Sequence, residues 1–438
     1  MCANNIILIK HKCTHLFRGY FIWGIVTLFY IFDNLLNIFP GAMKPELSAA
    51  FSRSAADLGS LSACYLWAYG IMQIPAGILI DRFGPRIVLT IASFVCAVGC
   101  YIFSSAYTFS TGVVGRLLIG FGASFAVVGC SKIATTWFPP KRFALFMGLM
   151  VSVGMTGAAF GLSTINKIIH VFASWRDVVL FGSAISVSIA VLIWFFVRDR
   201  PEGPVPWSIE LTSSNITKPH IGLFEALFEV ISCRQAWYVS TYAGLMFVPT
   251  LAFGGMWGIP YLVEAHAFSQ DLAGFSVGLI FIGWTFGGPI YGWFSDYIRR
   301  RKILMYFANI TTLLVSLCII YATHLSPMLI GTLMFLLGLF SSGFILAFAI
   351  MREQNRVEVS GISIGFINML NTILGGAVFQ YIIGKVLDWK AKDVIETEAG
   401  RIFSLLDYQR ALLLLPVCLV VSLIALMFLK ETYCKSKY

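Results

Sequence analysis

The chain has 438 residues, of which 58% are hydrophobic and only 12% are charged, whereas roughly a quarter of the residues in soluble domains are charged. So few polar side chains cannot cover a surface that faces water, so the composition excludes a soluble globular protein and predicts one surrounded by lipid. The net charge of +10 does not indicate nucleic-acid binding, because the bases form short clusters between apolar runs instead of one patch.

Residues 1–19, which carry three bases, are expected to form a cytoplasmic N-terminal lead. Twelve apolar runs follow, each close to the ~20 residues that an α-helix needs to cross ~30 Å of hydrocarbon. The predicted spans are 20–42, 58–80, 87–106, 108–135, 143–167, 177–197, 237–262, 273–295, 303–323, 326–350, 362–386 and 409–430. The chain is therefore predicted to be an all-α membrane protein with 12 transmembrane helices.

The distribution of bases predicts the orientation of these spans. If the N-terminus lies inside the cell, the inner segments hold 20 of the 31 Lys and Arg residues and the outer loops hold only 8. Loops rich in Lys and Arg stay on the cytoplasmic side of a membrane. Both termini are therefore expected to be cytoplasmic.

A stretch between the second and third runs reads Gly77-Ile-Leu-Ile-Asp81-Arg82-Phe-Gly84-Pro-Arg86. It resembles the loop signature Gly-x-x-x-Asp-Arg/Lys-x-Gly-x-Arg/Lys, which joins helices 2 and 3 in the major facilitator superfamily of secondary transporters. A second stretch, Gly292-Trp-Phe-Ser-Asp296-Tyr-Ile-Arg299-Arg300-Arg301, begins 215 residues after Gly77, close to half the length of the chain. This repeat predicts two related halves.

The repeat and the resemblance together predict two pseudo-symmetric six-helix bundles, which is the layout of that family (the MFS fold). The N-terminal bundle is expected at 20–197 and the C-terminal bundle at 237–430, followed by a cytoplasmic tail at 431–438. The proline-rich segment 198–236 is expected to be a cytoplasmic linker whose last part forms an interfacial helix.

The resemblance implies that the first stretch is a cytoplasmic gate, whose contacts form when the inner mouth closes and break when it opens. Its gating residues are Gly77, Asp81, Arg82, Gly84 and Arg86. Anchoring of the loop by its charges is the alternative, but anchoring would not require glycines at those offsets. The second stretch departs from the signature, because Tyr297 replaces the base and Arg299 the second glycine. Its candidate gating residues are Gly292, Asp296, Arg300 and Arg301.

Charged residues inside apolar runs are costly in lipid and usually face a cavity or a partner. Asp33 and Arg116 are predicted to lie ~20 Å and ~18 Å above the inner face, so they can pair if their helices are neighbours. The run Arg116-Leu-Leu-Ile-Gly120-Phe-Gly122 also resembles the family's helix 4 motif, whose arginine is associated with proton coupling. Asp33 and Arg116 are therefore candidates for a proton relay, and a static ion pair that only packs the helices is the alternative.

Polar side chains on the first and eleventh predicted helices indicate a solute cavity. They form a stripe around Asp33 and a similar stripe on the eleventh helix. The cavity candidates from these stripes are Tyr30, Asn34, Asn37 and Asn368. Asn371 and Gln380 are expected to form interhelical hydrogen bonds instead.

The seventh predicted helix is interrupted, because Pro249, Gly254, Gly255 and Pro260 bracket Trp257. Broken helices often line the binding sites of transporters. Trp257 is therefore a candidate for stacking on the solute, with simple packing as the alternative.

The glycines of the fifth predicted helix let a neighbouring helix approach closely. Family members that export drugs carry a related glycine-rich motif with a Gly-Pro step, whereas Thr156-Gly157-Ala158 has no proline. The sequence therefore favours uptake over drug export.

These observations predict a secondary active transporter whose cavity opens alternately to each side of the membrane. Phe32-Asp33-Asn34 and the hairpin after it resemble bacterial metabolite importers and, more loosely, lysosomal dipeptide carriers. The resemblance implies uptake of a small amino-acid-like or dipeptide-like solute, coupled to protons. Import of a sugar or carboxylate and efflux of drugs or metabolites remain open, and a receptor without transport activity is a remote alternative.

No nucleophile, metal-ligand or cofactor constellation is evident in the sequence, so neither an enzyme nor a cofactor is expected, and a proton gradient is the expected energy source. The expected partners are the small solute and the lipid bilayer, and nucleic acid is not expected. By the same resemblance we expect a monomer in the bacterial inner membrane.

Overall fold

The computed structural model describes residues 2–51, 54–138, 143–172, 174–201, 223–322, 325–355, 360–390, 395–397 and 400–434. Within these ranges, 11 helices are long and apolar enough to cross a membrane, and a shorter apolar stretch, Phe146–Gly161, lies in a further helix. Together they make the twelve membrane helices that the sequence predicts, arranged in two bundles.

The helices of the first half begin and end within a few residues of the predicted spans, except that the first one starts near the N-terminus. They are α1 (Cys2–Ala42), α2 (Lys44–Phe51), α3 (Ala55–Phe83), α4 (Pro85–Ser104), α5 (Phe109–Ala123), α6 (Phe125–Trp137), α7 (Phe143–Phe172) and α8 (Trp175–Phe196). Helices α5 and α6 together form the fourth membrane span, and α2 is a short helix outside the spans.

The second half contains several π-helical segments and one short β-hairpin. Its helices are α10 (Leu223–Ser232), α11 (Arg234–Val248), η2 (Pro249–Trp257), α12 (Gly258–Pro260), η3 (Tyr261–Ala265), α13 (Gln270–Ile298), α14 (Arg301–Tyr321), α15 (Pro327–Ser341), η4 (Ser342–Ile345), α16 (Leu346–Gln354), α17 (Ser360–Thr372), η6 (Ile373–Val378), α18 (Phe379–Lys390), α19 (Leu405–Leu412) and α20 (Leu414–Met427). Strands β1 (Ile395–Thr397) and β2 (Gly400–Ile402) pair antiparallel between α18 and α19.

The seventh span corrects one prediction from the sequence. The prolines and glycines near Trp257 do not break the helix, because Arg234–Ala265 runs as one span in which η2 and η3 are π-helical. A π-helical turn absorbs a proline by widening the helix locally, so the span remains continuous. The short helix α10 lies at the end of the predicted linker, and residues 202–222 of that linker lie outside the described residues.

Six spans start at the same end of the molecule, and each starts with a serine or threonine whose side chain accepts a hydrogen bond from a main-chain amide of the first turn. Such N-caps satisfy amides that have no partner inside the helix. The capping residues are Ser54, Thr108, Ser174, Ser269, Ser326 and Ser404. The sequence thus marks one end of the bundle with a repeated local signal.

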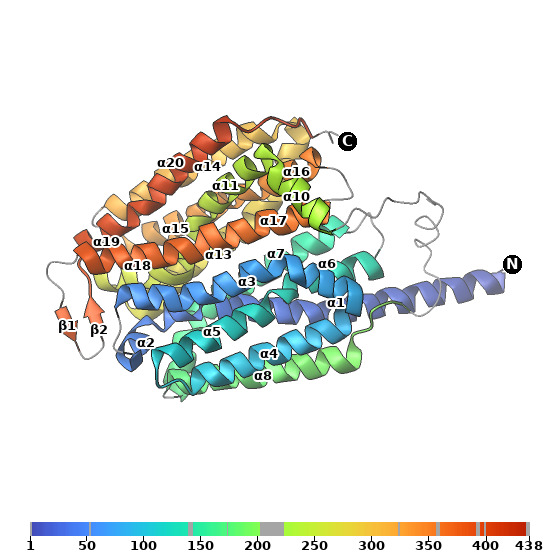
Figure 1. Ribbon diagram of the computed structural model, residues 1–438, viewed down its shortest axis with the longest axis horizontal. Helices are drawn as coiled ribbons and strands as arrows, with labels where there is room; N and C mark the ends of the chain where they lie inside the picture. Colours follow the sequence, from blue (N-terminus) through green and yellow to red (C-terminus); the bar gives the residue numbers. More distant parts are fainter. Residues whose placement is uncertain are drawn as a thin grey trace.

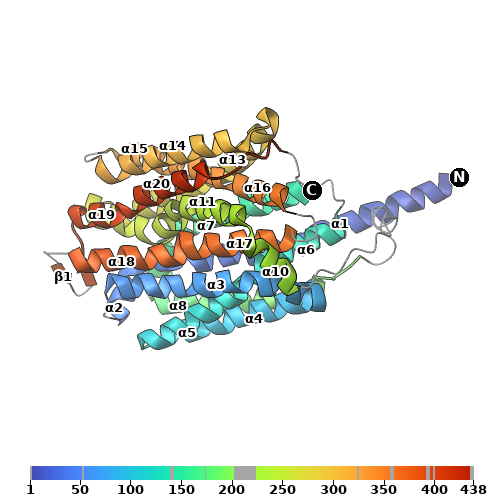
Figure 2. The same ribbon diagram turned by 45° about the horizontal axis from the view of Figure 1, so that its top comes forward.

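The two halves lie against each other along their length (Figure 1, Figure 2). Between them, α7 packs on α13, and α3 packs on α17, η6 and α18. We call the end that carries α2 and the β1–β2 hairpin the hairpin end, and the opposite end, which carries both chain termini, the termini end (Figure 1).

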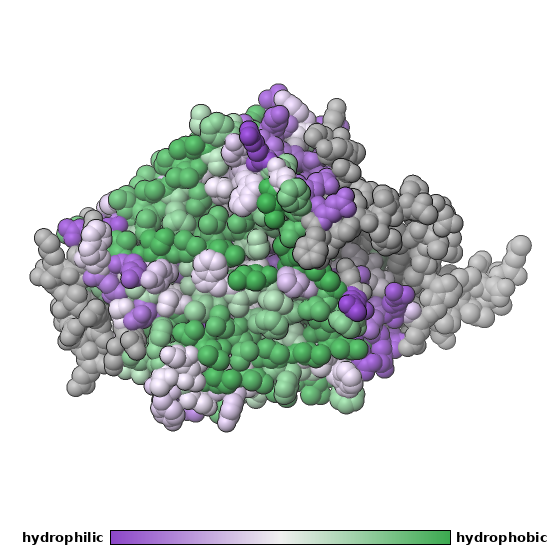
Figure 3. Space-filling model, viewed as in Figure 1, coloured by the Kyte–Doolittle hydropathy of each residue, from purple (hydrophilic) through white to green (hydrophobic). Residues whose placement is uncertain are grey.

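The surface between these two ends is apolar. Figure 3 shows a green hydrophobic belt between hydrophilic regions at the hairpin end and the termini end. Large side chains on the membrane spans, such as Phe94, Phe195 and Phe286, are 55%, 64% and 55% exposed. Apolar surface of this extent is stable only in contact with lipid.

Candidate functional site

The buried acid Asp33 and the tyrosine Tyr65 form the polar centre of the first half. Asp33 lies on α1 and is 3% exposed, and Tyr65 lies on α3 and is 1% exposed. The Tyr65 hydroxyl donates a hydrogen bond to the Asp33 carboxylate. A carboxylate this deep in an apolar bundle needs such a donor when it is ionised.

The sequence left open whether Arg116 pairs with Asp33, and among the described residues they form no ion pair. Arg116 is fully buried, and its Nη1 donates to the carbonyl of Leu36 at 2.7 Å. The guanidinium carbon lies 4.8 Å from the ring centre of Tyr65 and 4.9 Å from that of Phe39. Tyr65 therefore stands between the two charges, donating to the acid and receiving the cation on its ring.

Sequence reasoning missed Tyr65, although it connects the two predicted residues. A tyrosine in an apolar run is ordinary, and no local pattern shows which neighbouring helix its hydroxyl will reach. The four-residue spacing of Tyr65 and Tyr69, whose rings stack at 5.8 Å, marks a helix face but not the helix that packs on it.

The predicted polar stripe of α1 lies beside this centre. The Tyr30 ring packs so closely on Gly154 of α7 that a Cβ at position 154 would overlap it, which explains one of the glycines of the fifth span. The Asn34 side chain donates to the carbonyl of Tyr30 at 2.8 Å, within its own helix. Asn37 is half-buried.

The second half places its predicted residues differently. Asn368 on α17 is half-buried. Trp257 is fully buried, and its indole N–H donates to the carbonyl of Gln380 at 3.0 Å, so no face of this ring is open in this conformation. The Gln380 amide donates to the carbonyl of Leu251 at 2.9 Å, which confirms the expected interhelical hydrogen bond. Asn371 is 1% exposed, and among the described residues its amide has no hydrogen-bond partner.

A second polar centre, also missed from the sequence, joins three spans of the second half. The indole N–H of Trp284 on α13 lies 2.8 Å from the hydroxyl of Thr250 and 3.0 Å from that of Ser341. The rings of Phe247 and Phe344 stack at 4.7 Å beside it. This donor ties η2, α13 and α15 together in an apolar core, where an unpaired N–H would be costly.

The first predicted gating stretch forms the tight turn between α3 and α4, and Asp199, which follows α8, contacts it. Gly84 has a φ of +83°, which ordinary residues rarely adopt, and a Cβ there would lie 2.7 Å from the carboxyl carbon of Asp199. The same carboxylate accepts the main-chain N–H of Arg86 at 2.8 Å. Gly77 has open space where a Cβ would be. Arg82 is exposed, and the side chain of Asp81 lies outside the described residues.

The second predicted gating stretch forms its ion pairs and hydrogen bonds with residues of its own half. The Arg301 guanidinium lies 2.7 Å from a carboxylate oxygen of Glu353 on α16 and 3.1 Å from one of Asp296. Glu431, near the C-terminus, accepts the main-chain N–H groups of Arg301 and Lys302 at 3.1 and 2.9 Å. Gly292 has open space around it and Arg300 is exposed.

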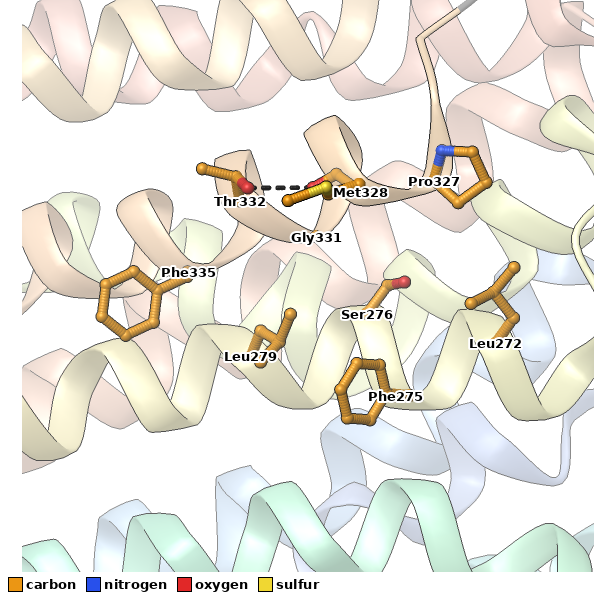
Figure 4. Close-up of a pocket in the computed structure, with 9 residues that line it drawn as sticks. All are labelled: Leu272, Phe275, Ser276, Leu279, Pro327, Met328, Gly331, Thr332 and Phe335. Atoms are coloured by element: carbon orange, nitrogen blue, oxygen red, sulfur yellow. Dashed lines mark hydrogen bonds between the residues drawn. The ribbon is translucent and has the colours of Figure 1, made fainter.

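A cavity of about 400 Å³ lies between α13 and α15, lined by Leu272, Phe275, Ser276, Leu279, Pro327, Met328, Gly331, Thr332 and Phe335 (Figure 4). Phe275 and Met328 are 58% and 85% exposed, so this cavity opens on the apolar belt and is separate from Asp33 and Trp284. Among the described residues, no group of His, Cys, Asp and Glu side chains could hold a metal ion.

Comparisons with known proteins agree with this architecture. The family model of the Major Facilitator Superfamily matches residues 22–380. The chain is 27% identical over 360 residues to a D-galactonate transporter of Escherichia coli O6:H1, covering 77% of this chain and 82% of that protein. It is 24% identical over 401 residues to a probable galactarate/D-glucarate transporter of Escherichia coli K12, covering 83% and 87%.

The fold is also similar to that of a solved structure. A bacterial homologue of the human lysosomal transporter Spinster superposes with a TM-score of 0.72 at 16% identity, covering 95% of this chain and 96% of that chain. At that identity the likeness concerns the fold alone.

Proposed function

Because this chain belongs to the Major Facilitator Superfamily, we propose that it imports a small hydroxylated organic acid, driven by the proton gradient. Its membership already makes it a multi-pass membrane protein and a secondary transporter of a small solute, not an enzyme. The proposed proton coupling rests on one observation above all, which is the buried Asp33–Tyr65 hydrogen bond in the first half.

The orientation of the protein is part of this proposal. The excess of bases in the segments at the termini end supports a cytoplasmic location for that end, which places the hairpin end outside the cell. The relatives described above are bacterial, which supports a location in the bacterial inner membrane.

Asp33 is the residue we propose for proton coupling. This residue is 3% exposed, and a charge at that depth is costly unless it is neutralised or hydrogen-bonded. In the ionised form, the Tyr65 O–H stabilises the carboxylate and the nearby Arg116 cation offsets its charge. When a proton from outside binds the carboxylate, the charge disappears and the acid becomes able to donate its own hydrogen bond.

This change gives a physical link between the proton and the helix packing. Tyr65 and Asp33 belong to α3 and α1, so the hydrogen bond between them holds two spans in register. Protonation of Asp33 weakens that charge-assisted bond, which allows α1 and α3 to move relative to each other. The proton is released when the site opens to the less acidic cytoplasm.

The solute site that we propose lies between the halves and uses the half-buried amides Asn34, Asn37 and Asn368 together with Tyr30. Amide and hydroxyl groups can donate to and accept from the hydroxyls and carboxylate of a sugar acid. The two relatives are named as transporters of galactonate and of galactarate or glucarate. These names support a sugar acid over the amino-acid-like or dipeptide-like solute that the sequence favoured.

For gating at the termini end, we propose the tight turn between α3 and α4 around Gly84.

The proposal is tested by uptake into proteoliposomes. Purified protein is reconstituted into vesicles that are acidic outside and neutral inside. Accumulation of radiolabelled galactonate, glucarate, neutral hexoses, amino acids and dipeptides inside them is then measured. We expect a sugar acid to accumulate and a protonophore to abolish the accumulation. Accumulation of an amino acid or dipeptide alone would overturn the proposal. So would loss of preloaded sugar acid from the vesicles as protons enter, which is the direction of efflux.

A further inference from the structure

We propose that Lys44 and Glu264 form a latch that closes the hairpin end of the transporter. Lys44 is the first residue of α2 in the first half, and Glu264 lies in η3 of the second half. The ammonium and carboxylate are 2.5 Å apart, and their side chains are only 5% and 13% exposed. A buried ion pair across two bodies that must separate during transport is a natural point of control.

Three aromatic rings of the second half lie around the ammonium of Lys44 and form a socket for it. Its Nζ lies 5.3 Å from the ring centre of Phe403 and 5.9 Å from those of Trp257 and Tyr408. The Tyr408 hydroxyl lies 3.3 Å from Nζ. Aromatic faces attract a cation and exclude water, so they strengthen the ion pair that they surround.

Glu264 is equally well fixed. One carboxylate oxygen binds Lys44, and the other accepts the main-chain N–H of Phe403 at 3.0 Å. Both oxygens therefore have partners, and the acceptor is held in place before the lysine arrives. This arrangement makes Glu264 a preformed receptor for the lysine of the other half.

The main chain next to Lys44 also packs tightly against the second half. A Cβ at Gly41, near the end of α1, would lie 2.7 Å from the carbonyl oxygen of Gly255 in η2, so only glycine allows this approach. The Gln270 side chain donates to the carbonyl of Ala42 at 3.0 Å. The contacts of Gly41, Ala42 and Lys44 thus form one continuous seam between the halves.

Opening of the hairpin end must withdraw Lys44 from this socket. In the closed seam, removal of either charge leaves the other one buried and unpaired, which is strongly unfavourable. In the open state both charges are hydrated and the loss of one has little effect. The pair therefore stabilises the closed state selectively and sets the equilibrium between closed and open hairpin ends.

The test measures conformation in the full chain, reconstituted in lipid nanodiscs without solute. Spin labels are placed at Tyr107 and Met328, which are 83% and 85% exposed and lie in the first and second halves at the hairpin end, after replacement of accessible native cysteines. We expect Lys44→Gln and Glu264→Gln each to raise the population with long label distances, relative to the population with short ones, by roughly tenfold.

Two further variants separate a latch from a general loss of stability. The doubly neutral variant Lys44→Gln with Glu264→Gln leaves no unpaired buried charge, so it should keep more of the closed population than either single variant. Arg410→Gln, which breaks an ion pair within α19 of the second half, should leave the distances unchanged. Unchanged distances in both single variants, or a double variant as open as the single ones, would overturn the latch. Because no solute is present, this result is independent of whether the solute proposed above is correct.

Discussion

Asp388 caps the first turn of α3 from the other half of the molecule: its two carboxylate oxygens accept the main-chain N–H groups of Ala55 at 3.0 Å and Ala56 at 2.6 Å. A carboxylate is favourable there because these amides have no partner within the helix and the helix dipole is positive at that end. The last turn of α18 thus meets the first turn of α3 at the hairpin end. A second acid, Asp81, lies at the other end of α3, in the stretch that we propose as a gate.

Replacement of Asp388 by alanine should loosen the hairpin end. The two amides would lose charge-assisted acceptors, which costs about 1–2 kcal/mol at a helix N-terminus. We expect a lower apparent melting temperature and a longer distance between labels at Tyr107 and Met328. Asp177→Ala, which removes an exposed acid from the first turn of α8, is the matched control. Equal effects of the two variants would show that the cap does not join the halves.

Replacement of Asp33 by asparagine should separate transport from the proton gradient. The amide keeps the size of the side chain and can accept from Tyr65, but it cannot bind and release a proton. We expect no accumulation under an imposed pH gradient, with exchange of labelled for unlabelled solute still measurable in proteoliposomes. Accumulation with the pH dependence of the original protein would assign Asp33 to packing.

Gly84→Ala should destabilise the hairpin between α3 and α4. A side chain at a φ of +83° is strained and would also meet Asp199, and such strain costs on the order of 1–3 kcal/mol. Gly77→Ala is the control in the same motif, because no atom lies within 4 Å of its added Cβ. Thermal unfolding should show a lower melting temperature for Gly84→Ala and an unchanged one for Gly77→Ala. If Gly77→Ala lowered stability as much, the strain argument would fail.

Trp284→Phe should weaken the core of the second half without affecting its membrane surface. The substitution keeps an aromatic ring but removes the N–H that reaches Thr250 and Ser341. Those hydroxyls still lie 3.2 Å from each other, so the loss should be limited to about 1 kcal/mol. Trp293→Phe, on the same helix but 70% exposed, should be neutral in the same unfolding assay. A neutral Trp284→Phe would show that the indole hydrogen bonds add nothing to stability.

His266, which follows η3 at the hairpin end, should make stability depend on pH. Partial burial lowers the pKa of its imidazole, and its Nε2 lies 2.8 Å from the Tyr261 hydroxyl with the Phe268 ring beside it. In the unfolded chain the imidazole binds a proton once the pH falls below ~6.5, whereas in the folded protein it binds one only at lower pH. The free energy of unfolding therefore falls as the pH falls. Melting temperatures should decrease more on acidification in the original protein than in His266→Gln. Parallel curves would contradict this.

The sequence was sufficient to predict the spans and the two bundles, because each span must cover its length with apolar side chains. The run predicted at 303–323, for example, became α14 at Arg301–Tyr321. Asp33 could be singled out as a candidate because a single acid in such a run is costly. Tyr65 could not, since its importance depends on which helix packs beside α3.

Contacts between the halves were beyond sequence reasoning for the same reason. Lys44 and Glu264 are separated by 220 positions and both lie near the ends of predicted helices, where charges are ordinary. Their pairing depends on how two bundles meet. The continuity of the seventh span was also missed, because prolines and glycines permit either a break or a π-helical path.

That π-helical path has a consequence for motion. A π-helix holds more residues per turn than an α-helix, so conversion of η2 to α-helical geometry would turn the part of the span beyond it by about 100° for each residue displaced. Trp257 and Glu264 would rotate together about the helix axis, while each main-chain amide exchanges one carbonyl acceptor of the helix for the next. Such a rotation would move the Glu264 carboxylate away from Lys44 and the Trp257 indole out of its buried position at the same time.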